Sequence, residues 1–526
     1  MNEGRAKGCL LASVVWIFIL GTLAVGYKFL IHPYLSEKLT RETGNTDSRY
    51  RQQIVVAADS FSGYAILRSP AVRDELKAKQ IKLVVQDDKG DYVGRLKGLQ
   101  SGASQLAVFT IDSLLSAGAR AGDFPASIVL VLDETKGSDA MVAMQSAVKG
   151  LEDLNDPSAR IVLTPNSPSE FLARVVLAHF DLPRLPAQWS IEAQGASDVY
   201  RKFKAAPATE KRAYVLWEPY VSLALKKPGA QVLLDSSKLK GCIVDVLVAQ
   251  RAFLRDHPEQ VQAVLEAYCR ANYTYQQKPE SLAKLIMEDA RETGSDSLDE
   301  TQARQVMAGI QWRNTLENYV HFGVGENRPA GDLTHLEDII GNIVDVLLKT
   351  KGLAKDPLNG QYHTLFYSQV LASMKAANFH PGKGLNLIEG LGNSATSEIV
   401  RAEKELAALS PEQWSRLRPV GHLRTEPISF RRASSQLSEQ GERDLQDLVK
   451  RLKSFPQFYV RVIGQARAEG DLEANRQLAQ ARAEAAAQYL IAQGLASHRL
   501  KTEAVVSAED SGEAQAVAFV VGQMPY

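Results

Sequence analysis

The 526-residue chain has little cysteine and no excess of charge of either sign. Three cysteines, Cys9, Cys242 and Cys269, are too few for a disulfide framework, and no CxxC or Cys/His cluster suggests a zinc site. We expect Cys242 and Cys269 to be buried thiols, with a disulfide between them as the alternative. Lys+Arg and Asp+Glu number 61 each, so the chain lacks the basic excess typical of nucleic-acid-binding proteins, and no nucleic-acid partner is expected.

The chain also lacks the sequence motifs of common enzyme classes. Its nine histidines are scattered, and there is no HExxH motif, no P-loop and no G-x-S-x-G elbow. Carboxylate pairs such as Asp87-Asp88 are typical of solvated loops, and His179, in an apolar helical segment, is typical of a buried structural histidine. We therefore predict a protein that is not an enzyme and needs no cofactor or metal.

One long apolar run stands near the start. Residues 9–27, CLLASVVWIFILGTLAVGY, contain no charged residue and are long enough to span most of a hydrocarbon core of about 30 Å. Arg5 and Lys7 precede the run, so the positive-inside rule places the N-terminus in the cytoplasm. A cleaved signal peptide is the alternative, since Ala24-Val25-Gly26 resembles a cleavage site. Both readings export the rest of the chain.

The length of the chain predicts two or three domains. From residue 52 strands and helices alternate, which indicates βαβ crossovers and a largely parallel sheet. A long helical stretch follows from about 251 to 373, and the last hundred residues alternate strands with two helices, as a compact α+β module would. The predicted organisation is a cytoplasmic tail (1–8), a transmembrane anchor (9–31), a linker (32–51), an α/β domain with a helical extension (52–390), a second linker (391–423) and a C-terminal α+β domain (424–526).

Polar residues follow several predicted strands and open helices. Ligands in open α/β sheets lie outside the carboxyl ends of strands, where helix N-termini present free N–H groups. Asp59-Ser60 and Thr110-Ile111-Asp112 stand at such junctions. Ser167-Pro168-Ser169-Glu170 is a capping box with proline at the first helical position. Plain helix capping explains Ser167 and Ser169 as well as ligand contact does, so both interpretations stay open.

The segment from about 52 to 275 resembles periplasmic solute-binding proteins of the nitrate, sulfonate and taurine class. The resemblance lies in the order of several phrases: AADSFSGYAIL (57–67), DETKGSDAMV (133–142), TPNSPSEFL (164–172) and VLWEPY (215–220), followed by GCIVDVLVAQ (241–250). It implies a two-lobed type II α/β fold that closes around a small solute and works with an ABC permease or another inner-membrane partner.

The resemblance also implies a set of ligand-binding residues in the cleft between the lobes. Trp217 would stack on the ligand or belong to the core, and Asp139 would hold a turn near the lobe crossover. The full candidate set is Asp59, Ser60, Thr110, Asp112, Ser167, Ser169, Trp217 and Glu218. Asp59, Asp112 and Glu218 would make the cleft acidic, which disfavours a bare anion such as nitrate and favours a cationic, zwitterionic or polar solute.

Residues 425–526 resemble the OmpA-like domain, a peptidoglycan-binding module. The segment GQARAEG (464–470), with Asn475 and Arg482 after it, fits the family spacing G-H-T-D-x-x-G…N-x-x-L-S-x-x-R-A. The resemblance implies that Asn475 and Arg482 bind peptidoglycan, Arg482 taking the carboxylate of diaminopimelate. Arg467, however, stands where the family aspartate receives the ammonium, a charge reversal that costs several kcal/mol at short range. Peptidoglycan is thus a weakened candidate partner, and docking to another protein is the alternative.

Together these observations predict a membrane-tethered periplasmic protein that delivers or senses a small polar solute and carries an envelope-attachment module. The alternative is a non-catalytic scaffold of an envelope complex, in which the solute cleft is vestigial. Whether the cleft binds any solute separates the two hypotheses.

Overall fold

The computed structural model describes residues 50–294, 297–325, 334–383, 398–401, 405–468, 470–507 and 517–524. The described chain divides into a small unit (50–54 and 74–84) and a large unit that holds all its other residues. The predicted tail and anchor, and residues 32–49 of the predicted linker, lie outside the described residues. No described helix is long and apolar enough to cross a bilayer.

The first lobe is built on a six-stranded sheet with the order β11-β4-β10-β3-β1-β2. The apolar runs of the two strands that flank β10 explain their place, because every residue of β3 and β4 is buried. The bounds are β1 (Gln52–Ala58), β2 (Ile81–Asp87), β3 (Leu106–Thr110), β4 (Ala126–Thr135), β10 (Val244–Gln250) and β11 (Ile310–Trp312). Helices of this lobe include α3 (Ala65–Arg68), α4 (Pro70–Ala78), α5 (Tyr92–Ser101), α6 (Ile111–Ala121), α10 (Arg251–Asp256), α11 (Pro258–Gln277), α12 (Pro279–Glu292), α13 (Glu300–Ala308), α14 (Thr315–His321), α15 (Leu336–Lys349) and α16 (Gln369–Ala376).

The prediction of a largely parallel sheet is wrong at the centre of this lobe. Strands β1 and β3 are parallel, but β10 runs antiparallel to both of its neighbours, β3 and β4. The physical reason is that β10 re-enters the first lobe after the chain has built the second lobe, so no right-handed βαβ crossover fixes its direction.

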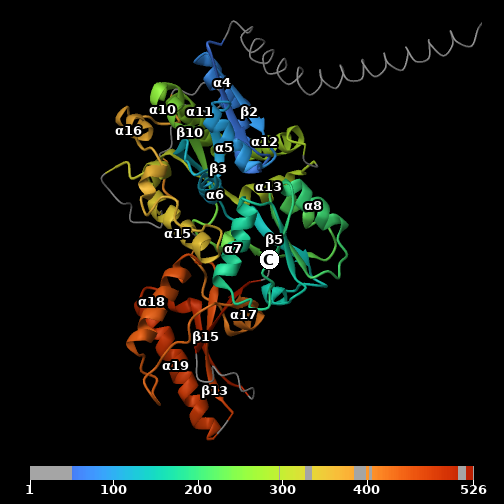
Figure 1. Cartoon of the computed structure of the whole chain (residues 1–526), viewed down its shortest axis with the longest axis vertical. Helices are drawn as coiled ribbons and strands as arrows, with labels where there is room; N and C mark the ends of the chain where they lie inside the picture. Colours follow the sequence, from blue (N-terminus) through green and yellow to red (C-terminus); the bar gives the residue numbers. More distant parts are fainter. Residues whose placement is uncertain are drawn as a thin grey trace, which may run out of the picture. The chain divides into compact units, whose positions relative to one another are not determined.

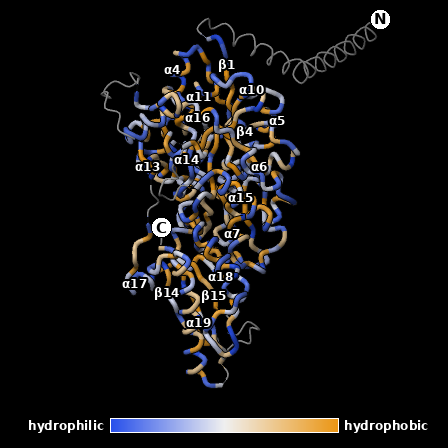
Figure 2. The backbone as a smooth tube through the Cα atoms, turned by 90° about the vertical axis from the view of Figure 1, so that its left-hand side faces the viewer, coloured by the Kyte–Doolittle hydropathy of each residue, from blue (hydrophilic) through white to orange (hydrophobic). Residues whose placement is uncertain are grey.

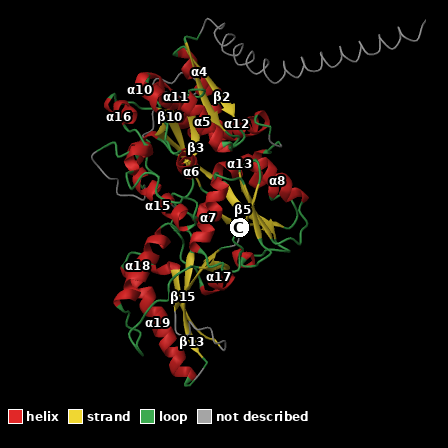
Figure 3. Cartoon of the chain, in the orientation of Figure 1, coloured by secondary structure: helices red, strands yellow, loops and turns green. Residues whose placement is uncertain are grey.

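The second lobe has a five-stranded sheet with the order β7-β6-β8-β5-β9. Its strands are β5 (Asp139–Met144), β6 (Arg160–Leu163), β7 (Ser190–Glu192), β8 (Arg212–Trp217) and β9 (Ala230–Asp235), and its α-helices are α7 (Pro168–His179), α8 (Gly195–Ala205) and α9 (Tyr220–Ala224). Helices α7 and α8 pack on this sheet, as Figure 1 shows. The strands of the two lobes form separate groups in Figure 3.

Two short crossover segments, 136–138 and 236–243, join the lobes. They are hydrogen-bonded to each other and to both lobes: Lys136 N–H donates to the Gly309 carbonyl at 2.7 Å, and Gly137 N–H donates to Ser236 Oγ at 2.8 Å. The N–H of Glu218 donates to the Ser138 carbonyl at 2.9 Å. Two sheets joined by two crossing segments confirm the predicted two-lobed fold.

The C-terminal module has a four-stranded sheet with the order β12-β15-β13-β14. The bounds are α17 (Pro411–Arg416), β12 (Arg418–His422), α18 (Glu439–Lys453), β13 (Tyr459–Arg467), α19 (Leu472–Ala492), β14 (Leu500–Ser507) and β15 (Val517–Gln523). Hydrophobic and hydrophilic residues both occur along α19 (Figure 2), which buries its alanines against β13 and β14. A Cβ at Gly464 would collide with the Ala479 carbonyl, so helix and strand approach closely there. The module is α+β, as predicted, but β12 lies within the range predicted as a linker and pairs with β15.

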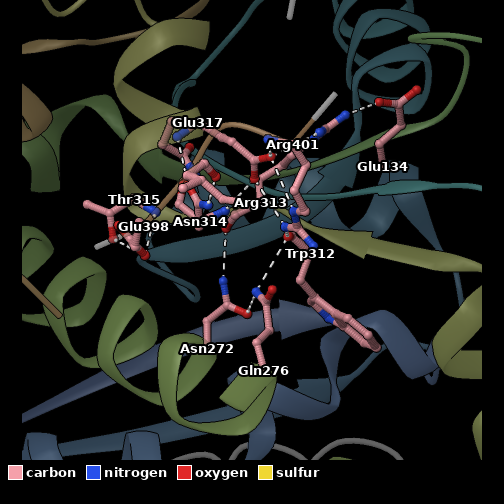
Figure 4. Close-up of polar contacts among 12 residues, drawn as sticks. Glu134, Asn272, Gln276, Trp312, Arg313, Asn314, Thr315, Glu317, Glu398 and Arg401 are labelled. Atoms are coloured by element: carbon pink, nitrogen blue, oxygen red, sulfur yellow. Dashed lines mark hydrogen bonds and ion pairs between the residues drawn. The ribbon is translucent and has the colours of Figure 1, made fainter. Parts of the chain in front are cut away.

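Residues 398–401, also within that predicted linker, are bound to the first lobe by a buried ion network (Figure 4). The Glu317 carboxylate is fully buried and lies 3.1 Å from the Arg401 guanidinium and 3.7 Å from that of Arg313. Arg313 also pairs with Glu134 near the end of β4. Glu398 accepts from the N–H of Thr315 at 3.3 Å. Residues 398–401 therefore help to hold the end of β4, the strand that leads into the crossover.

The buried cysteines agree with the sequence prediction. Cys242 and Cys269 are both buried and both free thiols, so the disulfide alternative is wrong.

Replacing Glu317 by glutamine should destabilise the protein by about 3 kcal/mol, because the substitution leaves two guanidinium groups without their shared buried carboxylate. Urea unfolding of the full chain, followed by circular dichroism, measures the change. Glu300→Gln is the matched control: it removes an exposed carboxylate that pairs with Arg304 one helical turn away, and it should leave the unfolding midpoint unchanged. Equal midpoints for the two variants would refute the supporting role of the network.

Candidate functional site

A small cavity lies between the two lobes at their crossover. It has a volume of about 10 Å³ and is lined by Asp59, Phe61, Tyr64, Tyr92, Thr110, Asp139, Pro168, Trp217, Ile243 and Asp245. This interlobe cavity holds a single water molecule at most. A solute can therefore enter only when the lobes separate or a lining side chain moves.

Strand register explains why acidic residues meet at this cavity. In the first lobe, Asp245 of β10 pairs with Thr110 of β3 on one side and with Asp133 of β4 on the other. In the second lobe, Asp139 at the start of β5 pairs with Trp217 at the end of β8. Residues that are opposite each other on neighbouring antiparallel strands have Cα atoms about 4.5–5.5 Å apart. The crossover thus brings Asp245 close to Asp133 and Asp139, which precede it by more than a hundred residues.

Asp59 is the one acid of the cavity lining that has a cationic partner. Its Oδ2 lies 3.0 Å from a guanidinium nitrogen of Arg95 and accepts from the Tyr92 hydroxyl at 3.2 Å. Its Oδ1 accepts from the N–H of Phe61 at 3.0 Å. Arg95 is buried and also pairs with Asp88 at 2.6 Å, so its charge is shared between two carboxylates. The charge of Asp59 is therefore balanced within the protein.

Four other buried aspartates lack such a partner. Asp112, Asp133, Asp139 and Asp245 each have at least one carboxylate oxygen that no donor among the described residues reaches. The Tyr64 hydroxyl donates to the other oxygen of Asp245. Of these four, Asp139 and Asp245 line the cavity, which therefore contains acid groups without a cationic partner among the described residues.

The pKa values of these groups follow from their burial. Burial raises the pKa of Asp112 to about 8 and that of Asp245 to about 7, the Tyr64 hydrogen bond offsetting part of the shift in Asp245. Burial, with the nearby Asp245 carboxylate as the next cause, raises the pKa of both Asp133 and Asp139 well above the ordinary range. Much of the cluster is thus protonated near neutral pH, and a cation placed beside it would favour the ionised form.

The structure separates the predicted ligand residues into two groups. Asp59, Thr110 and Trp217 line the cavity, and the indole N–H of Trp217 is buried without an acceptor among the described residues. Asp112, in the first turn of α6, is buried but does not line the cavity, and Ser60 does not line it either.

Two of the remaining predicted residues, Ser167 and Glu218, bind N–H groups at helix starts, and Ser169 joins its helix to strand β8. Ser167 Oγ accepts from the N–H of Ser169 at 3.2 Å, and Ser169 Oγ donates to the Val215 carbonyl. Glu218 accepts from the N–H of Ser222 at 3.0 Å and from its hydroxyl at 2.8 Å, at the start of α9. None of these three side chains lines the cavity, so the structure favours the capping interpretation.

The sequence prediction missed Tyr64, Tyr92, Asp133 and Asp245, and it assigned Asp139 to a turn. A signal for Asp245 is present, because the acid interrupts the apolar strand sequence IVDVLVA (243–249). A carboxylate inside an otherwise buried strand needs a partner or a function. The pairing of that strand with Asp133 could not be read from local sequence.

The candidate peptidoglycan residues lie on α19. Arg482 is largely buried; its Nε donates to the Ser434 carbonyl at 3.0 Å and its guanidinium lies over the Phe430 ring. Asn475 follows the helix cap Asp471, whose carboxylate accepts from two N–H groups of the first turn. Asp471 is thus committed to capping.

Residues 429–516 match the family model described as the OmpA family. This part of the chain is an OmpA-family domain. In it, Arg467 is the last residue of β13.

Several solved structures are similar to a larger part of the chain. The alkanesulfonate-binding protein SsuA from Xanthomonas axonopodis pv. citri is 15% identical, with a TM-score of 0.46 over 58% of this chain and 96% of its own. The aliphatic sulphonate-binding protein SsuA from Escherichia coli is 14% identical, with a TM-score of 0.44 over 61% and 99%. The nitrate-binding protein NrtA from Synechocystis PCC 6803 is 11% identical, with a TM-score of 0.45 over 62% and 89%. No curated protein sequence matches the chain.

Asp112→Asn should make the protein less sensitive to pH. The folded pKa of about 8 lies above the ordinary value of 3.8, so unfolding releases a proton between these values and stability falls as pH rises from 4 to 8. The amide removes this loss, and the variant should have a higher melting temperature than the parent at pH 8 but not at pH 4. Melting curves of both proteins across this range, recorded by circular dichroism, check the prediction. A steeper pH dependence in the variant would contradict the protonated state of Asp112.

Proposed function

We propose that the chain is a solute receptor of the bacterial envelope. In this proposal residues 9–31 anchor it in the inner membrane, the two lobes close around a small polar solute in the periplasm, and the OmpA-family domain attaches it to the envelope. The receptor passes the solute, or a signal of its presence, to an inner-membrane partner such as an ABC permease.

The observation that carries the proposal is the interlobe cavity with its unpartnered polar atoms. Buried polar groups in folded proteins almost always have hydrogen-bond partners. Here four aspartates and the Trp217 indole, all buried, have atoms without any among the described residues, and the cavity between the lobes is where most of them converge. A solute enclosed by the lobes would supply the missing partners, and hinge closure around a ligand is a common mechanism for such architectures.

The anchor is supported by the uncharged run at 9–27 and by the basic residues before it. A protein that spans the bilayer stays in the membrane pellet during alkaline extraction. Release of a shortened chain into the soluble fraction would instead indicate a cleaved signal peptide.

The scaffold alternative also has an observation in its favour, the cavity volume of about 10 Å³. A vestigial cleft would stay closed against every solute, whereas a receptor cleft opens to admit one. Binding therefore decides between the two functions.

Thermal-shift screening of the full chain in detergent should find a stabilising solute, because a ligand at about 100 times its Kd adds about 2.7 kcal/mol to the stability of the state that binds it. The full chain is needed, since a fragment that ends at 390 lacks Arg401 and with it part of the first-lobe ion network. Trp217→Phe replaces the indole by a smaller aromatic ring that has no N–H, and should weaken the response. No response across amines, amino acids, sulfonates and vitamin precursors would favour the scaffold.

Attachment to the cell wall is supported by the OmpA-family domain and by Arg482, and is opposed by Arg467, where the family has an aspartate. If the charge reversal is what weakens wall binding, Arg467→Asp should increase retention of the full chain on diaminopimelate-type sacculi at low salt. Adding Arg482→Ala to that variant should remove the gain. Retention of the parent as strong as that of Arg467→Asp would refute the charge argument, and no retention of either protein would favour docking to another protein.

A further inference from the structure

We infer that the interlobe cavity selects a compact organic cation, a primary or secondary ammonium that also carries a neutral hydrogen-bond acceptor, and that Asp139 and Asp245 hold the ammonium group. This inference rests on the proposed receptor function and names the solute class of the same site.

A charge inventory of the surroundings points to a cation. Each buried or nearly buried arginine around the site already pairs with two carboxylates or binds one in bidentate fashion. Arg95 pairs with Asp59 and Asp88, Arg313 with Glu134 and Glu317, and Arg68 with Asp289. Asp133, Asp139 and Asp245 have no cationic partner among the described residues. An added anion would lie beside two acid groups, with the Trp217 indole N–H as the one lining donor that lacks an acceptor among the described residues, while an ammonium would meet unpartnered oxygens.

The position of Asp139 and Asp245, which both line the cavity, suits one shared ammonium. Asp133 and Asp245 face each other in register across β4 and β10 of the first lobe, and Asp139 begins β5 just beyond the crossover in the second lobe. The Asp245 carboxylate is close enough to raise the pKa of both Asp139 and Asp133. An ammonium between Asp139 and Asp245 would therefore attract both lobes at once and favour the closed arrangement.

The rest of the cavity defines the other features of the solute. The buried Trp217 indole N–H has no acceptor among the described residues and donates to a neutral oxygen or nitrogen of the solute. Phe61, Tyr64, Tyr92 and Trp217 provide aromatic walls, which attract an organic cation through their ring faces.

A solute carboxylate or sulfonate does not fit the same site. The donors that line the cavity are largely committed: Tyr64 donates to Asp245, Tyr92 to Asp59, and Thr110 Oγ1 to Ser113 Oγ. Among these lining donors, the Trp217 indole N–H remains to donate to an acceptor atom of the solute. One neutral donor without a cation does not compensate a buried full negative charge.

Binding of the ammonium should release protons and strengthen with rising pH. Asp245, with a pKa of about 7 in the closed cavity, must ionise to pair with the cation, so affinity increases from pH 6 to pH 8. The titratable and charged groups around Asp245 are Asp59, Tyr64, Tyr92, Arg95, Asp112, Asp133, Asp139 and Tyr268.

Isothermal titration of the full chain with four small probes tests the inference. 2-Aminoethanol is the cation with a neutral acceptor, 1,2-ethanediol its neutral counterpart, glycine the zwitterion and methanesulfonate the anion. We expect 2-aminoethanol to bind at least tenfold more tightly than the other three, more tightly at pH 8 than at pH 6, and with proton release that depends on the buffer.

Asp245→Asn should weaken 2-aminoethanol binding at least tenfold and remove most of its pH dependence. Asp139→Asn tests the second lobe independently, should Asp245→Asn fail to fold. Glu218→Gln is the matched control, because it neutralises a buried acid with a raised pKa of about 7 that binds Ser222 and does not line the cavity. Its binding should equal that of the parent.

Preference for methanesulfonate, glycine or 1,2-ethanediol would overturn the cation inference and leave the receptor function standing. So would a solute from the wider screen that binds while 2-aminoethanol does not, or 2-aminoethanol binding that Asp245→Asn and Asp139→Asn leave unchanged. Only the absence of any binding solute would remove the proposed function together with the inference.

Discussion

The structure around the interlobe cavity depends on the burial of acid groups that the described protein does not neutralise. An ionised carboxylate in a nonpolar interior is so costly that it takes up a proton or finds a partner. Asp59 has its partner in Arg95, whereas Asp133, Asp139 and Asp245 are held largely protonated by burial and by one another. These aspartates lie on strands that lead into or out of the crossover, which is the region about which the lobes would move. Their charge state could therefore affect that movement directly.

The alternation of apolar strands and helices was enough to predict an α/β domain, and the resemblance to solute-binding proteins implied its two lobes. Strands β3 and β4 are continuous apolar runs, and such runs are typical of strands covered on both faces. The direction of β10 could not be predicted in the same way, because its apolar pattern is the same in parallel and antiparallel sheets. Only the path of the chain through the second lobe decides it. The observed start of the C-terminal module differs from the predicted linker boundary for a similar reason. β12 is a strand because β15, a hundred residues later, pairs with it.

The candidate site was predictable where local rules apply. Asp59, Thr110 and Trp217 follow or end strands, and all three line the cavity. Capping residues obey the same local rules, so Ser167, Ser169 and Glu218 could not be told apart from ligand residues by sequence. Asp133 and Asp245 were not predicted as site residues, because their pairing depends on the register of two strands that are more than a hundred residues apart in the sequence. Long-range register sets the chemistry here, and no local pattern encodes it.

The location of the acids also determines how a cation would act on the lobes. A carboxylate on an outer loop of one lobe would bind the cation equally well in open and closed forms, and binding that is equal in two states shifts nothing between them. Asp139 belongs to the second lobe and Asp245 to the first, and both line the cavity, so separation of the lobes would pull the ion away from one of its two partners. The same cation therefore interacts more strongly with the closed form. Cation binding and lobe closure would thus be coupled, because the acids that bind the cation lie on both sides of the crossover.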